Sequence, residues 1–189
     1  MLNRNEILEK LKKELEAERF KHSLRVEKIA LKLGEKYRVN KNQIAAAALL
    51  HDCARRYDRR GLLKKARLIG LKIDPIRKFE PKLFHAEISA HLARTEFGIR
   101  SAKVLRAIRR HTTGAVKMSE LEKIVYLADH IEEERGFAGV EKIRKLAFKN
   151  LDQAVFEAAS NMLRFLLKNK LPIYPDTVRT RNSALQRLL

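Results

Sequence analysis

The stretch IAAAALLHDCAR (residues 44–55) joins an apolar run to a histidine and an aspartate. Small and branched apolar residues in such a run are typical of a helix that is buried on most of its sides. A carboxylate buried beside it costs free energy unless an ion pair or a metal ion compensates its charge. Because His-Asp pairs also arise by chance, the pair His51-Asp52 alone favours a packed core histidine.

The remaining sequence is helical in pattern. Apolar residues recur at helical spacing, and no segment alternates convincingly as a strand. Capping patterns at Asn40 with Gln43, at Asp58, and at Ser119 with Glu122 mark helix starts. The predicted helices cover residues 4–17, 20–37, 44–54, 58–70, 84–98, 101–111, 121–134, 139–148 and 151–168, with a short tail helix after Pro172 and Pro175.

No linker rich in Gly, Ser or Pro divides the chain, and its length of 189 residues suits one domain. We therefore expect a single all-α domain over residues 1–189. Within it, residues 1–18 form an N-terminal helix, 19–170 the core, and 171–189 a C-terminal turn and tail helix.

The composition narrows the class of protein. An apolar content of 45% excludes a largely disordered chain. The single Cys53 cannot form an internal disulfide, and the longest apolar run (44–50) is far shorter than the roughly 20 residues that span a bilayer. With a charged N-terminal segment unlike a signal peptide, the sequence predicts a cytoplasmic protein without membrane contact.

The charge is strongly basic. The 42 Lys and Arg outnumber the 23 Asp and Glu, for a formal net charge of +19, and residues 53–82 alone hold 11 basic and 3 acidic residues. Such a field attracts polyanions, whether nucleic acid, anionic lipid or phosphate-rich small molecules.

Four residues beside apolar positions of three predicted helices are candidate metal ligands: His22, His51, Asp52 and Asp129. Mixed nitrogen and oxygen ligands suit Fe, Mn, Zn, Co or Ni better than Ca²⁺.

The order H…HD…D occurs together with RxxHSLRVEKIA, LLHDCAR, IRRHTTG, MSxLEKIVYLADHIE, R-x-F-x-GV and PDTVRTRN. This set resembles the HD-domain metal phosphohydrolases, and among them the YqeK-type symmetrical diadenosine tetraphosphate hydrolases, from about Phe20 to Leu188. The resemblance implies a single HD-domain helical bundle with a metal-binding core. It implies an enzyme, a symmetrical bis(5'-nucleosyl)-tetraphosphatase, that cleaves diadenosine tetraphosphate to two ADP by a metal-activated hydroxide.

The resemblance also implies two metal ions, expected to be iron, with Mn, Co, Ni and Zn as alternatives. Asp52 would bridge the two ions, so its loss should disrupt both sites. The implied ligands are His22, His51, Asp52 and Asp129 for the first ion, and Asp52, His85 and His111 for the second. We interpret His91 and His130 as packing or surface residues.

Positive and hydroxyl groups recur beside these ligands, which fits a polyphosphate better than an uncharged substrate. Asp52, Arg55 and Arg135 are expected to act in catalysis. The residues expected to contact substrate are Arg25, Thr112, Thr113, Gly114, Lys117, Arg135, Thr177 and Arg181.

Two substrate assignments keep a structural alternative. Capping of the last helix by Asp176 or Thr177 is as good an interpretation of PDTVRTRN as contact with substrate. Tyr57 and Phe137 are candidates for stacking on adenine, but core packing is the favoured interpretation.

The sequence departs from the family pattern at a few positions, and other functions are compatible with it. Glu133 and Ala138 stand where the family usually has Pro, which predicts a more mobile loop, and Arg55 replaces a usual Lys. The alternatives are a phosphohydrolase for another nucleotide, and a basic RNA-binding protein with a structural metal site. A secondary RNA contact through the basic surface and a homodimer are further expectations.

Overall fold

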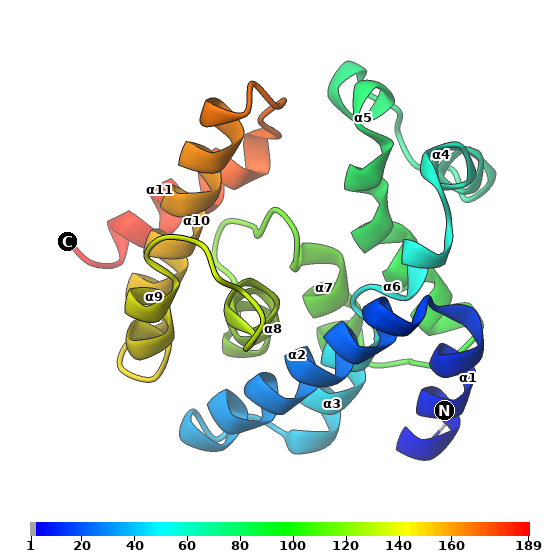
Figure 1. Cartoon of the computed structure of the whole chain (residues 1–189), viewed down its shortest axis with the longest axis horizontal. Coiled ribbons are helices and arrows are strands. Elements are labelled where there is room, and N and C mark those ends of the chain that lie inside the picture. The colour runs from blue at the N-terminus through cyan, green and yellow to red at the C-terminus, as the bar shows by residue number, and fades with distance from the viewer. Residues whose placement is uncertain (1–2) are drawn as a thin grey trace.

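The computed structural model describes residues 3–189, and within this range it is built from helices and loops without a strand. The predicted all-α fold class is therefore confirmed (Figure 1). Its helices are α1 (Arg4–Glu14), α2 (Ala17–Lys36), α3 (Lys41–Leu50), the 3-10 helix η1 (Cys53–Arg56), α4 (Arg59–Leu68), α5 (Pro75–Phe79), the 3-10 helix η2 (Pro81–Phe84), α6 (His85–Thr95), α7 (Ala102–Arg110), α8 (Glu120–Ile131), α9 (Val140–Ala147), α10 (Leu151–Lys168) and α11 (Pro175–Gln186).

The predicted caps form as expected. The Asn40 side chain accepts a hydrogen bond from the Gln43 amide at 3.0 Å, and Asp58 caps α4 in the same manner. At α8, the Ser119 hydroxyl accepts from the Glu122 amide at 3.4 Å while the Glu122 carboxylate accepts from the Ser119 amide at 3.3 Å. This reciprocal pair satisfies amides that the first helical turn leaves without partners.

Several predicted helices end a few residues early, and one of them does so next to the site. The expected helix at 44–54 stops as α3 at Leu50, and Asp52 is the N-cap residue of the 3-10 helix η1. The reason lies in α6: the hydroxyl of Ser89 accepts the amide hydrogen of Ala54 at 3.0 Å, replacing an intrahelical bond. His51 and Asp52 therefore lie in the turn between α3 and η1, and not on one face of a continuous helix.

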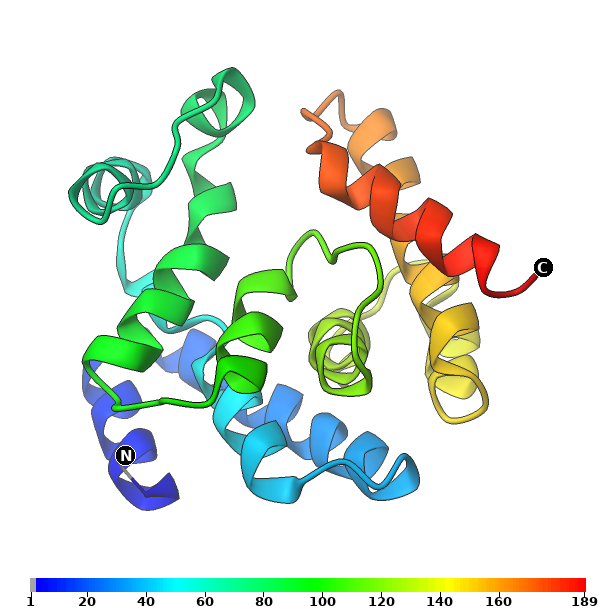
Figure 2. The same cartoon turned by 180° about the vertical axis from the view of Figure 1, so that it is seen from behind.

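α8 lies in the middle of the molecule, where both views look almost along its axis (Figures 1 and 2). It packs against α2, α3 and α7 on one side and against α10 on the other. Leu50 of α3, Ile108 of α7 and Ile124 of α8 are fully buried in this core. Among the described helices, none has both the length and the apolar character that crossing a membrane requires.

α10 and α11 pair as a C-terminal hairpin, and α11 also contacts the loop between α7 and α8 (Figure 2). The Thr180 hydroxyl donates to the Thr113 carbonyl at 2.9 Å. Gly114 has φ +69°, and a Cβ there would lie 2.5 Å from the Thr180 side chain. Only glycine fits this backbone at such close range, so Gly114 fixes the loop against the hairpin.

Candidate active site

Three histidines of the site are oriented in the same way. The Nδ1 atoms of His51, His85 and His111 each contact the backbone carbonyl three residues earlier, at 2.6 Å for His51 and 2.7 Å for His111. A carbonyl accepts only, so each Nδ1 carries the hydrogen and each Nε2 keeps a free lone pair. The local backbone thus fixes three nitrogen ligands in their metal-binding form.

At one end of the site, α2 and α8 meet. His22 Nε2 lies 3.0 Å from Asp129 Oδ1, and the same oxygen is 3.9 Å from His51 Nε2. His22 and His51 are buried, whereas the Asp129 side chain is 23% exposed.

At the other end, Asp52 faces α6 and α7. Its Oδ1 lies 3.3 Å from His85 Nε2 and 3.6 Å from His111 Nε2, while its Oδ2 is 3.7 Å from His51 Nε2. The two oxygens of one carboxylate thus face different histidines. All six residues form one continuous cluster, named the histidine–aspartate centre: His22, His51, Asp52, His85, His111 and Asp129.

Burial keeps two histidines of the centre, His51 and His85, neutral. It lowers the pKa of His51 to about 4 and that of His85 to about 3, although the negative charge of Asp52 partly raises both pKa values. Burial alone would raise the pKa of the Asp52 carboxyl, but His51, His111, His85 and Arg55 hold it well below its usual range. The centre therefore offers neutral imidazoles at His51 and His85 and ionised carboxylates at Asp52 and Asp129, the forms that bind metal ions.

The donor atoms fit a metal site. Within residues 3–189, His22 Nε2 and His51 Nε2 are buried without a hydrogen-bond partner, which is costly for polar atoms. His85 Nε2 and His111 Nε2 face each other at 3.0 Å, and the lone Thr112 hydroxyl near both can donate to only one at a time. Two groups, His22–His51–Asp129 and His51–Asp52–His111, each bring their ligand atoms within 4.8 Å of one another. The chain thus has groups that could hold metal.

Arginines surround the two carboxylates. Arg135 Nη2 lies 2.8 Å from Asp129 Oδ1, and Arg55 Nε lies 3.4 Å from Asp52 Oδ1. Arg19, which the sequence analysis did not single out, has Nη1 2.8 Å from Asp52 Oδ2. Its signal in the sequence was its position three residues before His22 on the same helix.

Arg25 contacts His22 through Glu132, and its expected contact with substrate remains a prediction. Arg25 Nε donates to Glu132 Oε2 at 2.8 Å, and Glu132 Oε1 lies 3.3 Å from His22 Nδ1. The buried Glu132 thereby orients the His22 ring, as second carboxylates do for metal-binding histidines. Sequence reasoning missed Glu132 because it follows α8 in an acidic run that reads as solvent-exposed.

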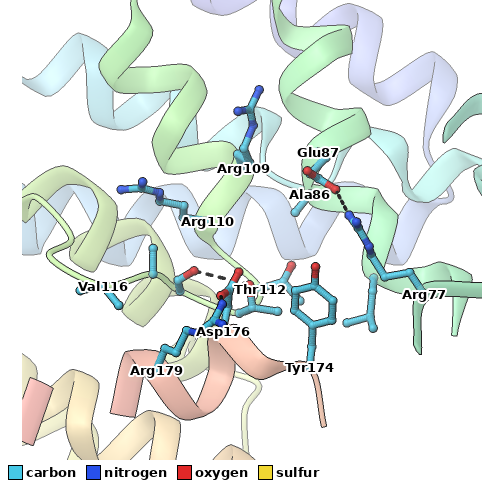
Figure 3. A pocket seen from close by; sticks show the side chains of 14 residues that line it. Arg77, Ala86, Glu87, Arg109, Arg110, Thr112, Val116, Tyr174, Asp176 and Arg179 are labelled. Carbon is cyan, nitrogen blue, oxygen red and sulfur yellow. Dashed lines mark hydrogen bonds and ion pairs between the residues drawn. The ribbon is translucent and has the colours of Figure 1, made fainter. Parts of the chain in front are cut away.

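A polar pocket of about 380 Å³ opens beside Thr112, between α6, α7 and the start of α11 (Figure 3). We name it the arginine pocket. Arg77 pairs with Glu87 across its wall, and Tyr174 lies close by. Arg109 has no ion pair with any described residue. The lining residues are Arg77, Leu83, Ala86, Glu87, Arg109, Arg110, Thr112, Thr113, Gly114, Ala115, Val116, Tyr174, Asp176 and Arg179.

Some of the residues expected to contact substrate line this pocket, and others do not. Thr112, Thr113 and Gly114 line it, whereas three others are placed elsewhere: Lys117 is exposed, Thr177 is buried in the first turn of α11, and Arg181 stacks on the Phe156 ring. The alternative that Asp176 or Thr177 caps the last helix is wrong, because Tyr174 is the cap residue and no side chain caps this helix by a hydrogen bond. Tyr174, Asp176 and Arg179 line the pocket.

A second pocket, of about 240 Å³, opens beside Asp129 between α8 and α10. We name it the aromatic pocket, after Phe137 and Phe165. His130, interpreted as packing or surface, lines it, with its ring 5.0 Å from that of Phe137. The full lining is Asp129, His130, Arg135, Phe137, Asn161, Met162 and Phe165.

The loop after Asp129 is tied down by Arg144. Its guanidinium donates to the carbonyl oxygens of Ile131, Glu132 and Arg135 at 2.7 to 2.9 Å. The mobility expected from Glu133 and Ala138 remains a prediction, although these bonds restrain the neighbouring backbone.

Comparison with known proteins places this geometry in a class. The sequence model of the HD domain matches residues 19–134, which include all six residues of the histidine–aspartate centre. A crystal structure from Clostridium acetobutylicum, described as a predicted HD superfamily hydrolase involved in NAD metabolism, superposes with a TM-score of 0.94 at 32% identity, covering 99% of both chains. The fold and the site are those of an HD-domain protein.

Two curated relatives narrow the class. A symmetrical bis(5'-nucleosyl)-tetraphosphatase of Bacillus subtilis is 34% identical over 96% of this chain and 97% of its own. The protein of the same name from Halalkalibacterium halodurans is 39% identical over 97% of this chain and 98% of its own. The chain therefore belongs to the symmetrical bis(5'-nucleosyl)-tetraphosphatase family of HD-domain proteins.

Proposed function

We propose that this chain is a metal-dependent hydrolase that cleaves diadenosine tetraphosphate symmetrically into two ADP. The observation that carries the proposal is the continuous centre from His22 to His111, with the arginine pocket at its Thr112 end. Family membership supports the same substrate. The overall reaction adds one water across the central anhydride: its oxygen joins one ADP, and the bridging oxygen leaves with the other.

The residues of the centre would hold two metal ions, in the arrangement His22, His51, Asp52 and Asp129 for one and Asp52, His85 and His111 for the other. We propose iron, because imidazole with carboxylate suits it, with Mn, Co, Ni or Zn as alternatives. Two such cations, when bound, supply an acidified water and neutralise charge on the attacked phosphoryl group.

The arginines position the polyphosphate. Arg135 and Arg55 already contact the carboxylates Asp129 and Asp52, so their guanidinium groups lie where phosphate oxygens approach the centre. The loop at Thr112 and Thr113 adds hydroxyl donors at the mouth of the arginine pocket. Such donors stabilise the negative charge that is redistributed when the anhydride breaks.

The test is turnover of diadenosine tetraphosphate by purified protein of measured metal content, with the nucleotides separated by ion-exchange chromatography. We expect two ADP per substrate, and a loss of at least about a thousandfold in Asp52→Ala. AMP with ATP as products would contradict symmetrical cleavage. Turnover of a different nucleotide in place of this substrate would support the alternative phosphohydrolase.

A secondary contact with RNA is a second candidate, because exposed cations gather on and near α4. Arg60, Lys64, Arg67, Lys72 and Lys78 are exposed and have no ion pair within residues 3–189. RNA binding that weakens steeply with salt and is unchanged in His111→Ala would support it. Absence of binding at physiological salt would contradict it. The cytoplasmic location and the homodimer expected from the sequence remain predictions.

A further inference from the structure

The aromatic pocket stands out because its chemistry differs from that of the rest of the site. Phe137, Met162 and Phe165 give it flat and polarisable apolar walls, whereas the arginine pocket has four guanidinium groups. Phe165 is 52% exposed although it is a large apolar side chain. An exposed aromatic at the edge of a pocket is a stacking surface for another ring.

The pocket also borders the reaction centre. Asp129 and Arg135 form its inner end, and Asp129 Oδ1 is 3.0 Å from His22 Nε2. The Arg135 side chain is 40% exposed, so it can contact a phosphate while the remainder of a nucleotide extends outward. A group bound here would therefore be joined to the phosphates at the centre.

The two pockets lie at opposite ends of the chain of contacts through the centre. The aromatic pocket reaches Asp129, and the arginine pocket reaches Thr112, whose hydroxyl is 3.0 Å from His85 Nε2. Between them the contacts run from Asp129 through His51 and Asp52. A substrate cleaved at its middle has one nucleoside on each side, and this arrangement offers one pocket to each.

His130 adds a polar group to the aromatic pocket. Its Nε2 is buried and makes no hydrogen bond with any described residue. Adenine has ring nitrogens that accept hydrogen bonds and an amino group that donates them. Either can pair with His130 Nε2, which donates or accepts according to the tautomer of the ring. The volume of about 240 Å³ is below the usual range for a whole drug-sized ligand, which suits a base alone.

We propose that the aromatic pocket binds the adenine of one half of the substrate, with Phe165 and Phe137 as stacking residues and His130 at the base edge. The inference rests on the proposed function for the substrate, and it assigns the two identical halves to unlike pockets. Phe165 and Phe137 are then specificity-determining residues that act on substrate binding.

The chain contains no tryptophan, so Phe165→Trp introduces a single fluorescent reporter. We expect titration with ADP to quench this fluorescence, and inorganic pyrophosphate, which lacks a base, to leave it unchanged. The matched control is Leu167→Trp, at an exposed apolar position of the same helix that does not line the pocket. An ADP response that is absent from Phe165→Trp, or equal in the two variants, would overturn the proposal.

Kinetics provide the second measurement. Phe165→Ala should raise KM for diadenosine tetraphosphate about tenfold and change kcat by less than about twofold, because loss of stacking weakens binding. Leu167→Ala should keep the parent KM. An unchanged KM in Phe165→Ala would overturn the proposal. If the parent protein does not hydrolyse this substrate, the proposed function fails, and the ADP fluorescence titration still decides whether the pocket binds adenine.

Discussion

The part of the chain matched by the HD domain, residues 19–134, differs from the C-terminal hairpin α10–α11 in what it contributes. The first part holds the whole histidine–aspartate centre, fixed by backbone carbonyls and buried carboxylates. The hairpin contains no histidine, yet Phe165 lines the aromatic pocket and Tyr174 lines the arginine pocket. The HD part thus supplies the whole centre, and the hairpin adds walls to both pockets beside it.

The largest effects should come from the centre and appear in kcat. His111→Ala removes a nitrogen ligand from the second implied ion, and we expect kcat for diadenosine tetraphosphate to fall about a hundredfold or more. His91→Ala is the matched control, since His91 lies on α6 with His85 but outside the centre, and its kcat should stay within about twofold of the parent. A drop of equal size in both variants would remove the distinction between the centre and its surroundings.

In metal-free protein, acid should destabilise the part that holds the histidine–aspartate centre before it destabilises the C-terminal hairpin. Folding lowers the pKa of His51 to about 4 and that of His85 to about 3 through burial. Below pH 6.5 these two histidines are therefore protonated in the unfolded chain while they stay neutral in the folded chain. The free energy of unfolding should therefore decrease from pH 6.5 to about 4, by about 1.4 kcal/mol per pH unit for each ring.

Denaturant titrations across this range give the free energy, and hydrogen exchange shows where protection is lost. We expect the loss to begin in α3, which ends next to His51, and in α6, which begins at His85, and to reach α10 and α11 last. Stability that rises on acidification, or exchange that begins in the hairpin, would contradict the assignment of the titrating groups to the centre.

The smallest effects should come from the arginine pocket and appear in KM. Arg109 lines this pocket without an ion partner among the described residues, so Arg109→Ala should raise KM about fivefold at low salt and leave kcat nearly unchanged. Lys103→Ala, on the same helix but outside the pocket lining, is the control. A larger change in kcat than in KM would show that this pocket takes part in the reaction step.

Much of the fold follows from local sequence signals. The caps at Asn40, Asp58 and Ser119 and the extent of the helix at 151–168 are local properties, and the structure confirms them. The early end of α3 was not predictable, because it depends on Ser89, which lies 35 residues from Ala54 in the sequence.

The residues of the site that belong to recognisable sequence motifs were predictable. The resemblance named the six residues of the centre, and the structure brings them together. Lys117, Thr177 and Arg181 were chosen for charge or hydroxyl groups near a motif. They do not line the arginine pocket, and their contact with substrate remains a prediction. The roles of Glu132 and His130 depend on contacts between elements that no spacing along the chain reveals.

The metal content of the purified, reconstituted protein decides whether the histidine–aspartate centre holds two ions. We expect two metal ions per chain, measured by elemental analysis against protein concentration. We also expect both ions to be lost in Asp52→Ala, because the Asp52 carboxylate oxygens of the parent face His51 on one side and His85 on the other. One ion or none in the parent protein, or two ions retained in Asp52→Ala, would contradict the two-ion assignment.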